Sequence, residues 1–328
     1  MHKYFLSVAL LVLSLLTGWF WLKSWQFVNK TLHHEKTSLQ EVLESSDLRT
    51  QFGIGVTSSP SDYHFTTFTE EEFSATDGVP LAAWFVQSAA RKDAPCLVFA
   101  HGRETNRLKT MKYLELVRQA GLQGQFHIFL PDLRNSGSSG KADNLLGYGY
   151  ALDLQASLLH LQKKYGIKKF VLYGFDTGAM GSLLAATLPE IHQPLKERQI
   201  NISGLVMDSP LSNAEEYLRR NMNGASEITY SLGTWMFNNR AGQHLDRMRL
   251  GVLGSHPQLP VLVLQNLGDE QTPTDMLLSE VGNAPHVELE LFDGEDHCRI
   301  FTNPKYRQKY VQRVKNFLLP LLRTNAVP

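Results

Sequence analysis

Short apolar runs alternate with helical patterns from about residue 51 to the end of this chain. Strands that alternate with helices pair in parallel, because each crossover helix returns the chain to the same edge of the sheet. The pattern therefore predicts a doubly wound, mostly parallel α/β sheet. The expected strands are residues 81–86, 95–100, 127–130, 169–173, 204–207, 261–265 and 287–291. The expected helices are residues 110–120, 145–165, 177–187 and 304–322.

Two segments depart from this alternation. Asp77-Gly78 is a hairpin turn signal, so an antiparallel pair is expected at the start of the sheet. Residues 211–259 separate two expected strands by far more chain than a crossover needs, and they include Tyr217 and Trp235. We interpret this insertion as a lid, the alternative being additional packing helices.

The first residues of the chain predict a membrane anchor. Residues 4–22 carry no charge, and as a helix they would span about 28 Å, close to the hydrocarbon thickness of a bilayer. A cleaved signal peptide is the alternative, but Trp19, Phe20 and Trp21 occupy the region where cleavage needs small residues. We expect a single-pass anchor over 1–28, a stalk over 29–50, and a domain over 51–328 on the non-cytoplasmic side.

Composition limits the partners of this domain. The chain has 32 Lys and Arg against 32 Asp and Glu, so nucleic acid is not expected as a partner. Its two cysteines, Cys96 and Cys298, exclude a disulfide scaffold, and we expect no disulfide between them. Neither an H-E-x-x-H nor a C-x-x-C motif occurs, so no metal or other cofactor is expected. Composition does not name a function, and a protein partner stays open. A small-molecule substrate is expected from the motifs described below.

Residues 171–182 contain the most informative motif. A strand runs into Gly174, Asp176 follows after one residue, Gly178 follows after one more, and a helix begins at once. Glycines on both sides of a central residue allow a tight strand-to-helix turn that exposes the central side chain over the helix N-terminus. This is the G-x-S-x-G elbow with Asp in place of Ser.

Further polar residues follow the other expected strands. They are the His101-Gly102 pair, Asp208, Asp269 and His297. Ligands of a parallel sheet bind at the carboxyl ends of its strands, so these residues are candidates for one site.

These motifs make the chain resemble the α/β-hydrolase family from about residue 63 to residue 322. It is most similar to the esterase-like and acyl-peptidase-like branch with a short lid. The resemblance rests on the 77–78 turn, the 101–102 loop, residues 132–137, the elbow, residues 208–210, the loop 268–273 and His297.

The resemblance implies a catalytic triad in the order nucleophile, acid and histidine. Asp176 takes the nucleophile position, and Asp269 orients His297, which is the general base. The implied oxyanion hole consists of the backbone N–H groups of Arg103 and Thr177. The alternative acid is Asp208, which also ends a strand. Cys298 invites a thiol chemistry of its own, but it lies outside the elbow.

Asp176 departs from the serine pattern and therefore decides the chemistry. A carboxylate attacks carbonyl carbons poorly, yet it attacks a saturated carbon that bears a leaving group or a strained ring. The haloalkane dehalogenase and epoxide hydrolase branches of the family work in this way. Their elbows usually carry Trp after the Asp, and the epoxide branch has Pro two residues beyond the His-Gly pair, whereas this chain has Thr177 and Glu104.

Three hypotheses follow for the function. In the first, the chain is a membrane-anchored hydrolase with Asp176 as nucleophile through a covalent ester, its substrate an ester, an epoxide or a carbon–halogen compound. In the second, it is a degenerate serine-hydrolase-like protein that binds a ligand or a partner without turnover. In the third, Asp176 is a general base.

Overall fold

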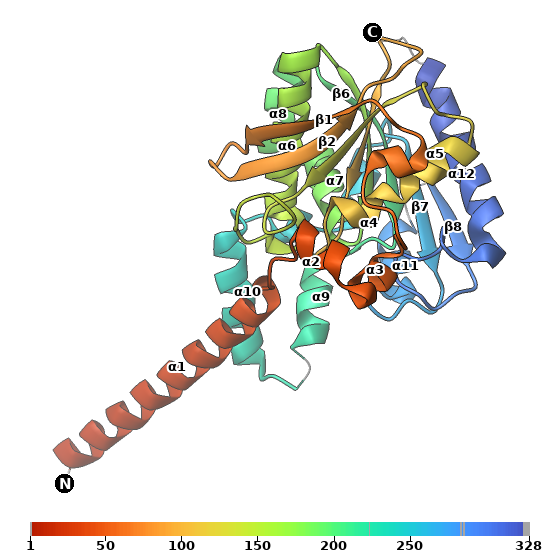
Figure 1. Ribbon diagram of the computed structural model, residues 1–328. Helices are drawn as coiled ribbons and strands as arrows, with labels where there is room; N and C mark the ends of the chain where they lie inside the picture. The colour runs from red at the N-terminus through yellow and green to blue at the C-terminus, as the bar shows by residue number, and fades with distance from the viewer. Residues whose placement is uncertain (1, 223, 283, 285, 324–328) are drawn as a thin grey trace.

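A single twisted sheet forms the centre of the protein (Figure 1). The computed structural model describes residues 2–222, 224–282, 284 and 286–323. Within them the sheet has eight strands in the order β1-β2-β4-β3-β5-β6-β7-β8. β2 pairs antiparallel with β1 and with β4, and the remaining neighbours are parallel. The strands are β1 Phe68–Ser74, β2 Pro80–Val86, β3 Cys96–Ala100, β4 His127–Asp132, β5 Lys169–Phe175, β6 Asn201–Asp208, β7 Val261–Asn266 and β8 Val287–Phe292.

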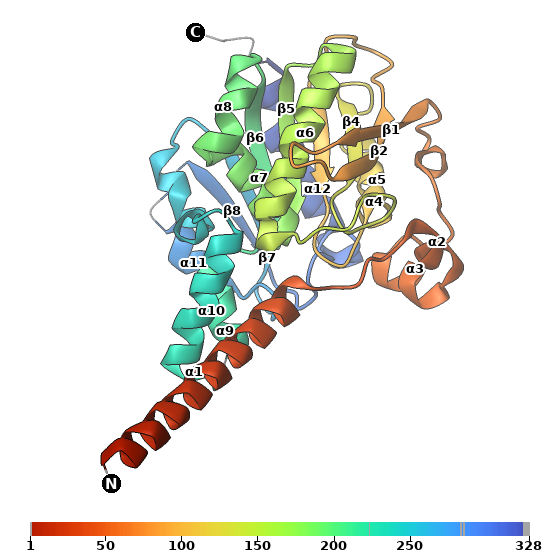
Figure 2. The same ribbon diagram turned by 90° about the vertical axis from the view of Figure 1, so that its left-hand side faces the viewer.

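Helices connect these strands and cover both faces of the sheet (Figures 1 and 2). The α-helices are α1 His2–Leu32, α2 Leu39–Glu44, α3 Ser46–Phe52, α4 Arg107–Met111, α5 Tyr113–Gln119, α6 Tyr148–Tyr165, α7 Thr177–Thr187, α8 Pro189–Glu197, α9 Ala214–Asn221, α10 Glu227–Arg240, α11 Thr274–Val281 and α12 Pro304–Arg323. The 3-10 helices are η1 Pro60–Tyr63, η2 Leu145–Gly147, η3 Leu245–Arg247 and η4 Leu250–Ser255.

The apolar residues of the central strands pack alternately into two cores. In β5, Phe170 and Leu172 pack with α6, α7 and α8, whereas Val171 and Tyr173 pack with α5 and α12. Successive side chains of a strand point to opposite faces, so a continuous apolar run fills a core on each side. The sheet is therefore buried between two helical layers.

The expected mostly parallel sheet is confirmed, whereas two expected helices differ in detail. The helix expected over 110–120 is divided between α4 and α5. The helix expected over 145–165 begins with η2, because Leu146 and Gly147 have φ angles of 50° and 112°. Positive φ does not fit an α-helix, so α6 begins only at Tyr148.

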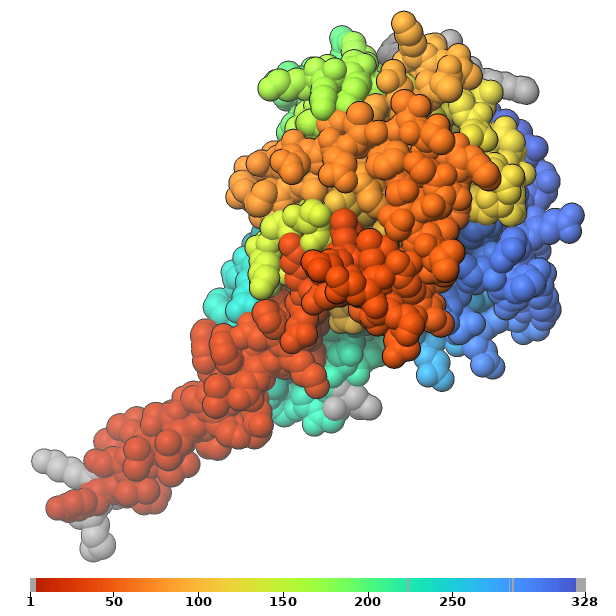
Figure 3. Space-filling view, viewed as in Figure 1, coloured from red at the N-terminus to blue at the C-terminus, as the bar shows by residue number. Residues whose placement is uncertain are grey.

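Helix α1 projects from the domain, and its second half packs along α10 (Figures 1 and 3). Its apolar side chains near the N-terminus are exposed, while Val28 and Leu32 are buried against the domain. The helix is long and apolar enough to cross a membrane, a test that signal sequences also pass. The segment 29–50, expected to be a stalk, contains the end of α1, α2 and most of α3, and its Val42 is buried in the α5–α12 core.

The insertion 211–259 contains α9, α10, η3 and η4. It lies between β6 and β7, and α10 lies beside α1 in both ribbon views (Figures 1 and 2). We keep the name lid segment for residues 211–259.

A buried ion-pair cluster joins the hairpin to the helical layer. The Arg134 guanidinium donates to the Asp153 carboxylate in α6 at 2.7 Å and to the Asp77 carboxylate at 2.8 Å. Asp153 is fully buried, and Arg134 keeps only 4% of its side-chain surface exposed. Removing one member of a buried pair leaves the other charge without compensation.

We expect Arg134→Met to lower the free energy of unfolding by about 3–5 kcal/mol, because Asp153 then keeps a buried charge without a partner. The control is Arg118→Met, since Arg118 forms an exposed pair with Glu115 whose loss costs about 1 kcal/mol or less. Urea denaturation of both full-length variants in mild detergent measures the two values. Equal losses would contradict this account of the cluster.

Candidate active site

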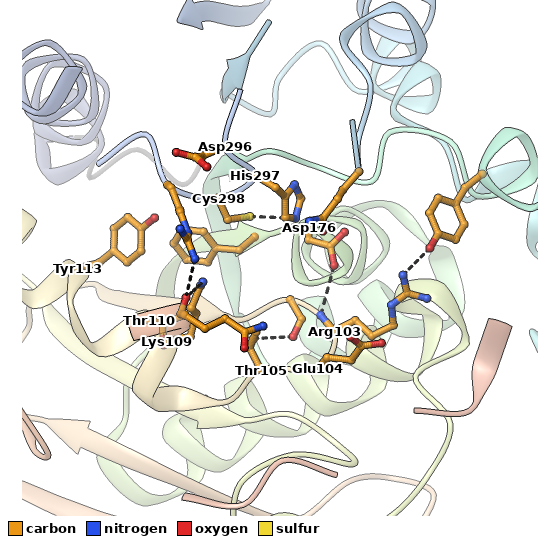
Figure 4. A pocket seen from close by; sticks show the side chains of 16 residues that line it. Arg103, Glu104, Thr105, Lys109, Thr110, Tyr113, Asp176, Asp296, His297 and Cys298 are labelled. Atoms are coloured by element: carbon orange, nitrogen blue, oxygen red, sulfur yellow. Dashed lines mark hydrogen bonds between the residues drawn. The ribbon is translucent and has the colours of Figure 1, made fainter. Parts of the chain in front are cut away.

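A cavity of about 460 Å³ opens at the carboxyl ends of the central strands (Figure 4). It is lined by residues from the loop after β3, the start of α4, the elbow, the lid segment and the loop after β8. Its lining includes Arg103, Lys109, Asp176, Tyr217, His297 and Cys298. The structure thus brings the expected nucleophile and histidine to one cavity.

Asp176 lies at the turn between β5 and α7 in a strained backbone conformation, with φ 49° and ψ −121°. The turn requires glycine at positions 174 and 178, because a side chain at either position would overlap the neighbouring backbone. A Cβ atom on Gly174 would lie 2.4 Å from the Ala179 Cα, and one on Gly178 would lie 2.2 Å from the Ala100 carbonyl oxygen. The two glycines of the motif are thus explained by close backbone approach.

The Asp176 carboxylate is held through one of its oxygens. Oδ2 accepts hydrogen bonds from the Arg103 N–H at 3.3 Å and from the Thr177 hydroxyl at 3.1 Å. A Cβ atom on Gly102 would lie 3.1 Å from Oδ2, so a larger residue there would displace the carboxylate by a few tenths of an ångström. Among the described residues, no hydrogen bond reaches Oδ1. One carboxylate oxygen is therefore fixed and the other is free.

The two expected oxyanion-hole residues both lie beside this carboxylate. The Arg103 N–H also donates to the Thr177 hydroxyl at 2.9 Å, so it is shared between the two acceptors. Thr177 is the first residue of α7, and the N–H groups of a first helical turn have no partner within the helix. Both backbone N–H groups thus lie next to Asp176, where the loop after β3 meets the turn between β5 and α7.

His297 and Asp269 form a close pair. The His297 Nδ1 and the Asp269 Oδ2 are 2.8 Å apart. Asp269 also accepts the N–H groups of Gln271 and Thr272 at 2.9 and 3.0 Å, and the Thr272 hydroxyl at 3.0 Å. Burial raises the pKa of Asp269, but the hydrogen bonds from His297 and Thr272 outweigh it and lower the pKa below its usual value. Asp269 is therefore held ionised beside the histidine.

The other ring nitrogen of His297 does not reach Asp176. Its Nε2 lies 3.3 Å from the Cys298 Sγ, and among the described residues no hydrogen bond joins His297 to Asp176 (Figure 4). Burial lowers the pKa of His297, but Cys298 and the hydrogen bond to Asp269 outweigh it and raise the pKa above its usual value.

Asp208, the alternative acid, is bound elsewhere. Its carboxylate accepts the hydroxyl groups of Tyr310 at 2.6 Å, Tyr113 at 3.2 Å and Ser209 at 3.0 Å. It is fully buried, and His297 donates to Asp269 instead. The geometry thus pairs the histidine with Asp269.

His101 supports the loop that carries Arg103. It is fully buried, its Nδ1 lies 2.8 Å from the Gly102 carbonyl, and its Nε2 accepts the Leu133 N–H at 2.9 Å. Burial lowers its pKa to about 4, so the ring is neutral at neutral pH and accepts at Nε2. His101 and Gly102 therefore shape the loop from behind the cavity.

Several lining residues escaped the sequence analysis as site residues, among them Tyr217 and Gln51. Tyr217 of α9 reaches the cavity and binds the Arg103 guanidinium, which also donates to the Thr31 carbonyl of α1 at 3.3 Å. The aromatic content of the lid segment was a signal for Tyr217. Gln51 of α3 also lines the cavity, and its polar surroundings in sequence gave no signal.

The donor set of the site does not suggest a metal centre. Within the described residues, no group of three or more His, Cys, Asp or Glu side chains is arranged to hold a metal ion. The arrangement offers a fixed carboxylate, an oriented histidine and backbone donors, which are the groups used in nucleophilic catalysis.

Comparison with known proteins agrees with this architecture. The profile of the family described as "alpha/beta hydrolase fold" matches residues 95–230. No curated protein sequence matches the chain. The structure is similar to that of the esterase Pf2001 from Pyrococcus furiosus, with a TM-score of 0.61, 20% identity, and coverage of 80% of this chain and 96% of that one.

Two further solved structures have the same fold. The α/β hydrolase GrgF from Penicillium sp. sh18 has a TM-score of 0.55 and 16% identity, and the match covers 78% of this chain and 99% of that one. A hydrolase from Pseudomonas aeruginosa PA01 has a TM-score of 0.52 and 15% identity, with coverage of 76% and 98%. Strand order, elbow and family profile agree, and the chain is an α/β-hydrolase-fold protein.

Proposed function

We propose that the protein is a membrane-anchored hydrolase in which Asp176 attacks an electrophilic saturated carbon and forms a covalent ester. The observation that supports the proposal is the unequal hydrogen bonding of the two Asp176 carboxylate oxygens. Its Oδ2 is held by the Arg103 N–H and the Thr177 hydroxyl, while Oδ1 has no hydrogen bond among the described residues. One fixed oxygen and one free oxygen suit a carboxylate nucleophile, and the labelling experiment below distinguishes this role from that of a general base.

The first step forms the ester. Asp176 Oδ1 attacks the carbon of the substrate, a C–O bond forms, and the bond to the halide or to the epoxide oxygen breaks. The halide leaves as an anion, whereas the opened epoxide oxygen takes a proton from water. A carboxylate is already deprotonated, so this step requires no proton transfer to His297. The lack of a direct hydrogen bond between His297 and Asp176 is therefore compatible with the mechanism.

The second step hydrolyses the ester. His297 Nε2 takes a proton from water, and the hydroxide attacks the Asp176 Cγ. Negative charge develops on Oδ2, which already lies beside the Arg103 N–H and close to the start of α7. The intermediate collapses, the alcohol leaves with the proton from His297, and Asp176 retains one oxygen from water. Asp269 stabilises the imidazolium during this step.

A degenerate, ligand-binding protein is the second candidate, and one observation favours it. The Arg103 N–H is already shared between Asp176 and Thr177, so it is not open to the oxyanion of a bound ester substrate. A serine-type esterase mechanism would need that donor free.

We expect His297→Gln to stop the reaction at the ester, because glutamine keeps a polar side chain but does not take the proton from water. The full-length variant is incubated with 1-bromobutane or styrene oxide, and intact mass and peptide mapping then reveal an adduct on Asp176. In ¹⁸O-labelled water, the wild-type protein should instead incorporate label into the Asp176 carboxylate.

The control is Gln312→Ala, which lies exposed on α12 outside the cavity and should turn over normally. Asp176→Ala should neither turn over nor form the adduct. Turnover without label in Asp176 would contradict the nucleophile role and favour a general base. Binding without turnover by any probe would favour the degenerate protein.

The raised pKa of His297 sets the direction of a pH dependence. Cys298, Asp269 and Asp176 face the ring, Asp208 lies nearby, and Cys298 and Asp269 contribute most to raising the pKa against the effect of burial. His297 must be neutral to act as a base, so ester hydrolysis should slow as pH falls through this raised pKa. Cys298→Ala should move the rising limb of the single-turnover profile to lower pH. An unchanged midpoint in that variant would contradict this assignment.

Membrane anchoring by α1 is supported by its exposed surface. The apolar side chains from Tyr4 to Trp25 are largely exposed, including Leu13 at 58%. Beside α1, helix α10 exposes Ile228 and Trp235, and the rings of Trp235 and Trp21 lie 6.2 Å apart. Aromatic residues of this kind gather at membrane interfaces. We further propose that the domain lies on the non-cytoplasmic side of that membrane.

We expect the native chain to stay in the membrane pellet after alkaline carbonate extraction. Its intact mass should show that residues 4–22 are still present. Leu13→Lys should shift it toward the soluble fraction, because a charge at the centre of a span costs about 2.5–3.5 kcal/mol. Val56→Lys is the control, since Val56 is 94% exposed outside α1. A mature chain that begins after residue 22 would identify a signal peptide instead. Protease digestion of spheroplasts tests the side of the domain.

A further inference from the structure

Cys298 completes a second constellation of reactive groups in the cavity. Its Sγ lies 3.3 Å from the His297 Nε2, and the His297 Nδ1 lies 2.8 Å from the Asp269 Oδ2 (Figure 4). Thiol, imidazole and carboxylate thus follow one another within contact distance. This order of groups activates nucleophilic cysteines in general.

The Asp269 carboxylate determines which His297 nitrogen faces the thiol as an acceptor. An ionised carboxylate only accepts hydrogen bonds, so the proton of a neutral ring lies on Nδ1. Nε2 then has a lone pair directed at the Cys298 thiol. Transfer of the thiol proton to Nε2 gives a thiolate beside an imidazolium, whose charge Asp269 stabilises.

The position of Cys298 is fixed by its backbone and by its surroundings. Its N–H donates to the Ser209 hydroxyl at 3.1 Å, and its φ is 51°, which is uncommon for a residue with a side chain. Cys298 is 5% exposed, yet it lines the cavity together with the cationic Lys109 and Arg299. Burial raises the pKa of the Cys298 thiol, and the adjacent His297 acts in the opposite direction, so the thiolate depends on contact with the histidine.

We propose that Cys298 is a nucleophilic thiol that captures soft electrophiles, with α,β-unsaturated carbonyl compounds as the ligand class. The Cys298 thiol gives its proton to His297, and the thiolate forms an S–C bond with the β-carbon of the conjugated system. The double-bond electrons move to an enolate, and the His297 proton ends on the α-carbon. The step is an addition with no leaving group, and it does not depend on the role of Asp176.

Cys96 serves as an internal reference. It lies in β3, it is fully buried, and burial raises the pKa of its thiol. Among the described residues its thiol contacts the Leu97 carbonyl and no histidine, in contrast to Cys298. A difference in labelling between the two cysteines therefore measures what the cavity and His297 contribute.

N-ethylmaleimide, a conjugated carbonyl probe, tests the proposal on the full-length protein in mild detergent at pH 7. Peptide mass spectrometry follows Cys298 and Cys96 separately, with glutathione in a parallel tube as the free thiol. We expect Cys298 to react faster than glutathione and Cys96 to stay unlabelled. Reaction of Cys298 more slowly than glutathione overturns the proposal, because a merely accessible thiol is slowed by burial.

Two variants separate activation from access. His297→Gln and Asp269→Asn should each slow Cys298 labelling by about tenfold or more, whereas Gln271→Ala, on the same cavity wall, should leave it unchanged. Labelling of Cys96 would show that a variant has unfolded. If His297→Gln does not fold, the labelling rate of the Asp269→Asn variant provides the test. An unchanged rate in a folded His297 or Asp269 variant overturns the proposal.

Discussion

Helix α7 approaches strand β3 so closely at Gly178 that any side chain there would overlap the Ala100 carbonyl oxygen. This contact forces the chain to leave β5 and enter α7 within one residue, which is why Asp176 has a positive φ. The same contact brings the start of α7 beside the loop after β3. Arg103 and Thr177 therefore meet at the Asp176 carboxylate, and the position of the proposed nucleophile and its hydrogen-bond donors depends on this approach.

Asp in the elbow changes what the surrounding donors do. A serine hydroxyl would leave the Arg103 N–H open to a substrate oxygen, but the carboxylate brings its own oxygen to that donor. The oxyanion of the proposed second step then forms on Asp176 itself, so the same donor serves ground state and intermediate. In the proposed mechanism His297 does not need to deprotonate the nucleophile. Its Nε2 lies beside the Cys298 Sγ and not beside Asp176.

Local pattern and fixed spacing predicted most of the sheet and the elbow, and the resemblance to the α/β-hydrolase family implied the order of Asp176, Asp269 and His297. These features depend on residues close in sequence or on strand ends that any parallel sheet brings together. The division of 110–120 into α4 and α5, and the contact of Tyr217 with Arg103, depend on packing between distant segments. The contact of His297 Nε2 with Cys298 Sγ occurs where Cys298 has a positive φ, a backbone conformation that the sequence did not predict.

Arg103 physically connects the parts of the chain that lie outside the sheet to the reacting carboxylate. Its N–H donates to Asp176, while its guanidinium binds Tyr217 of α9 and the Thr31 carbonyl near the end of α1. Arg103 thus contacts α1, the lid segment and the proposed nucleophile. A shift of α1 relative to the domain would therefore act on the loop that holds Asp176 Oδ2, which makes the N-terminal helix part of the architecture of the site as well as a proposed anchor.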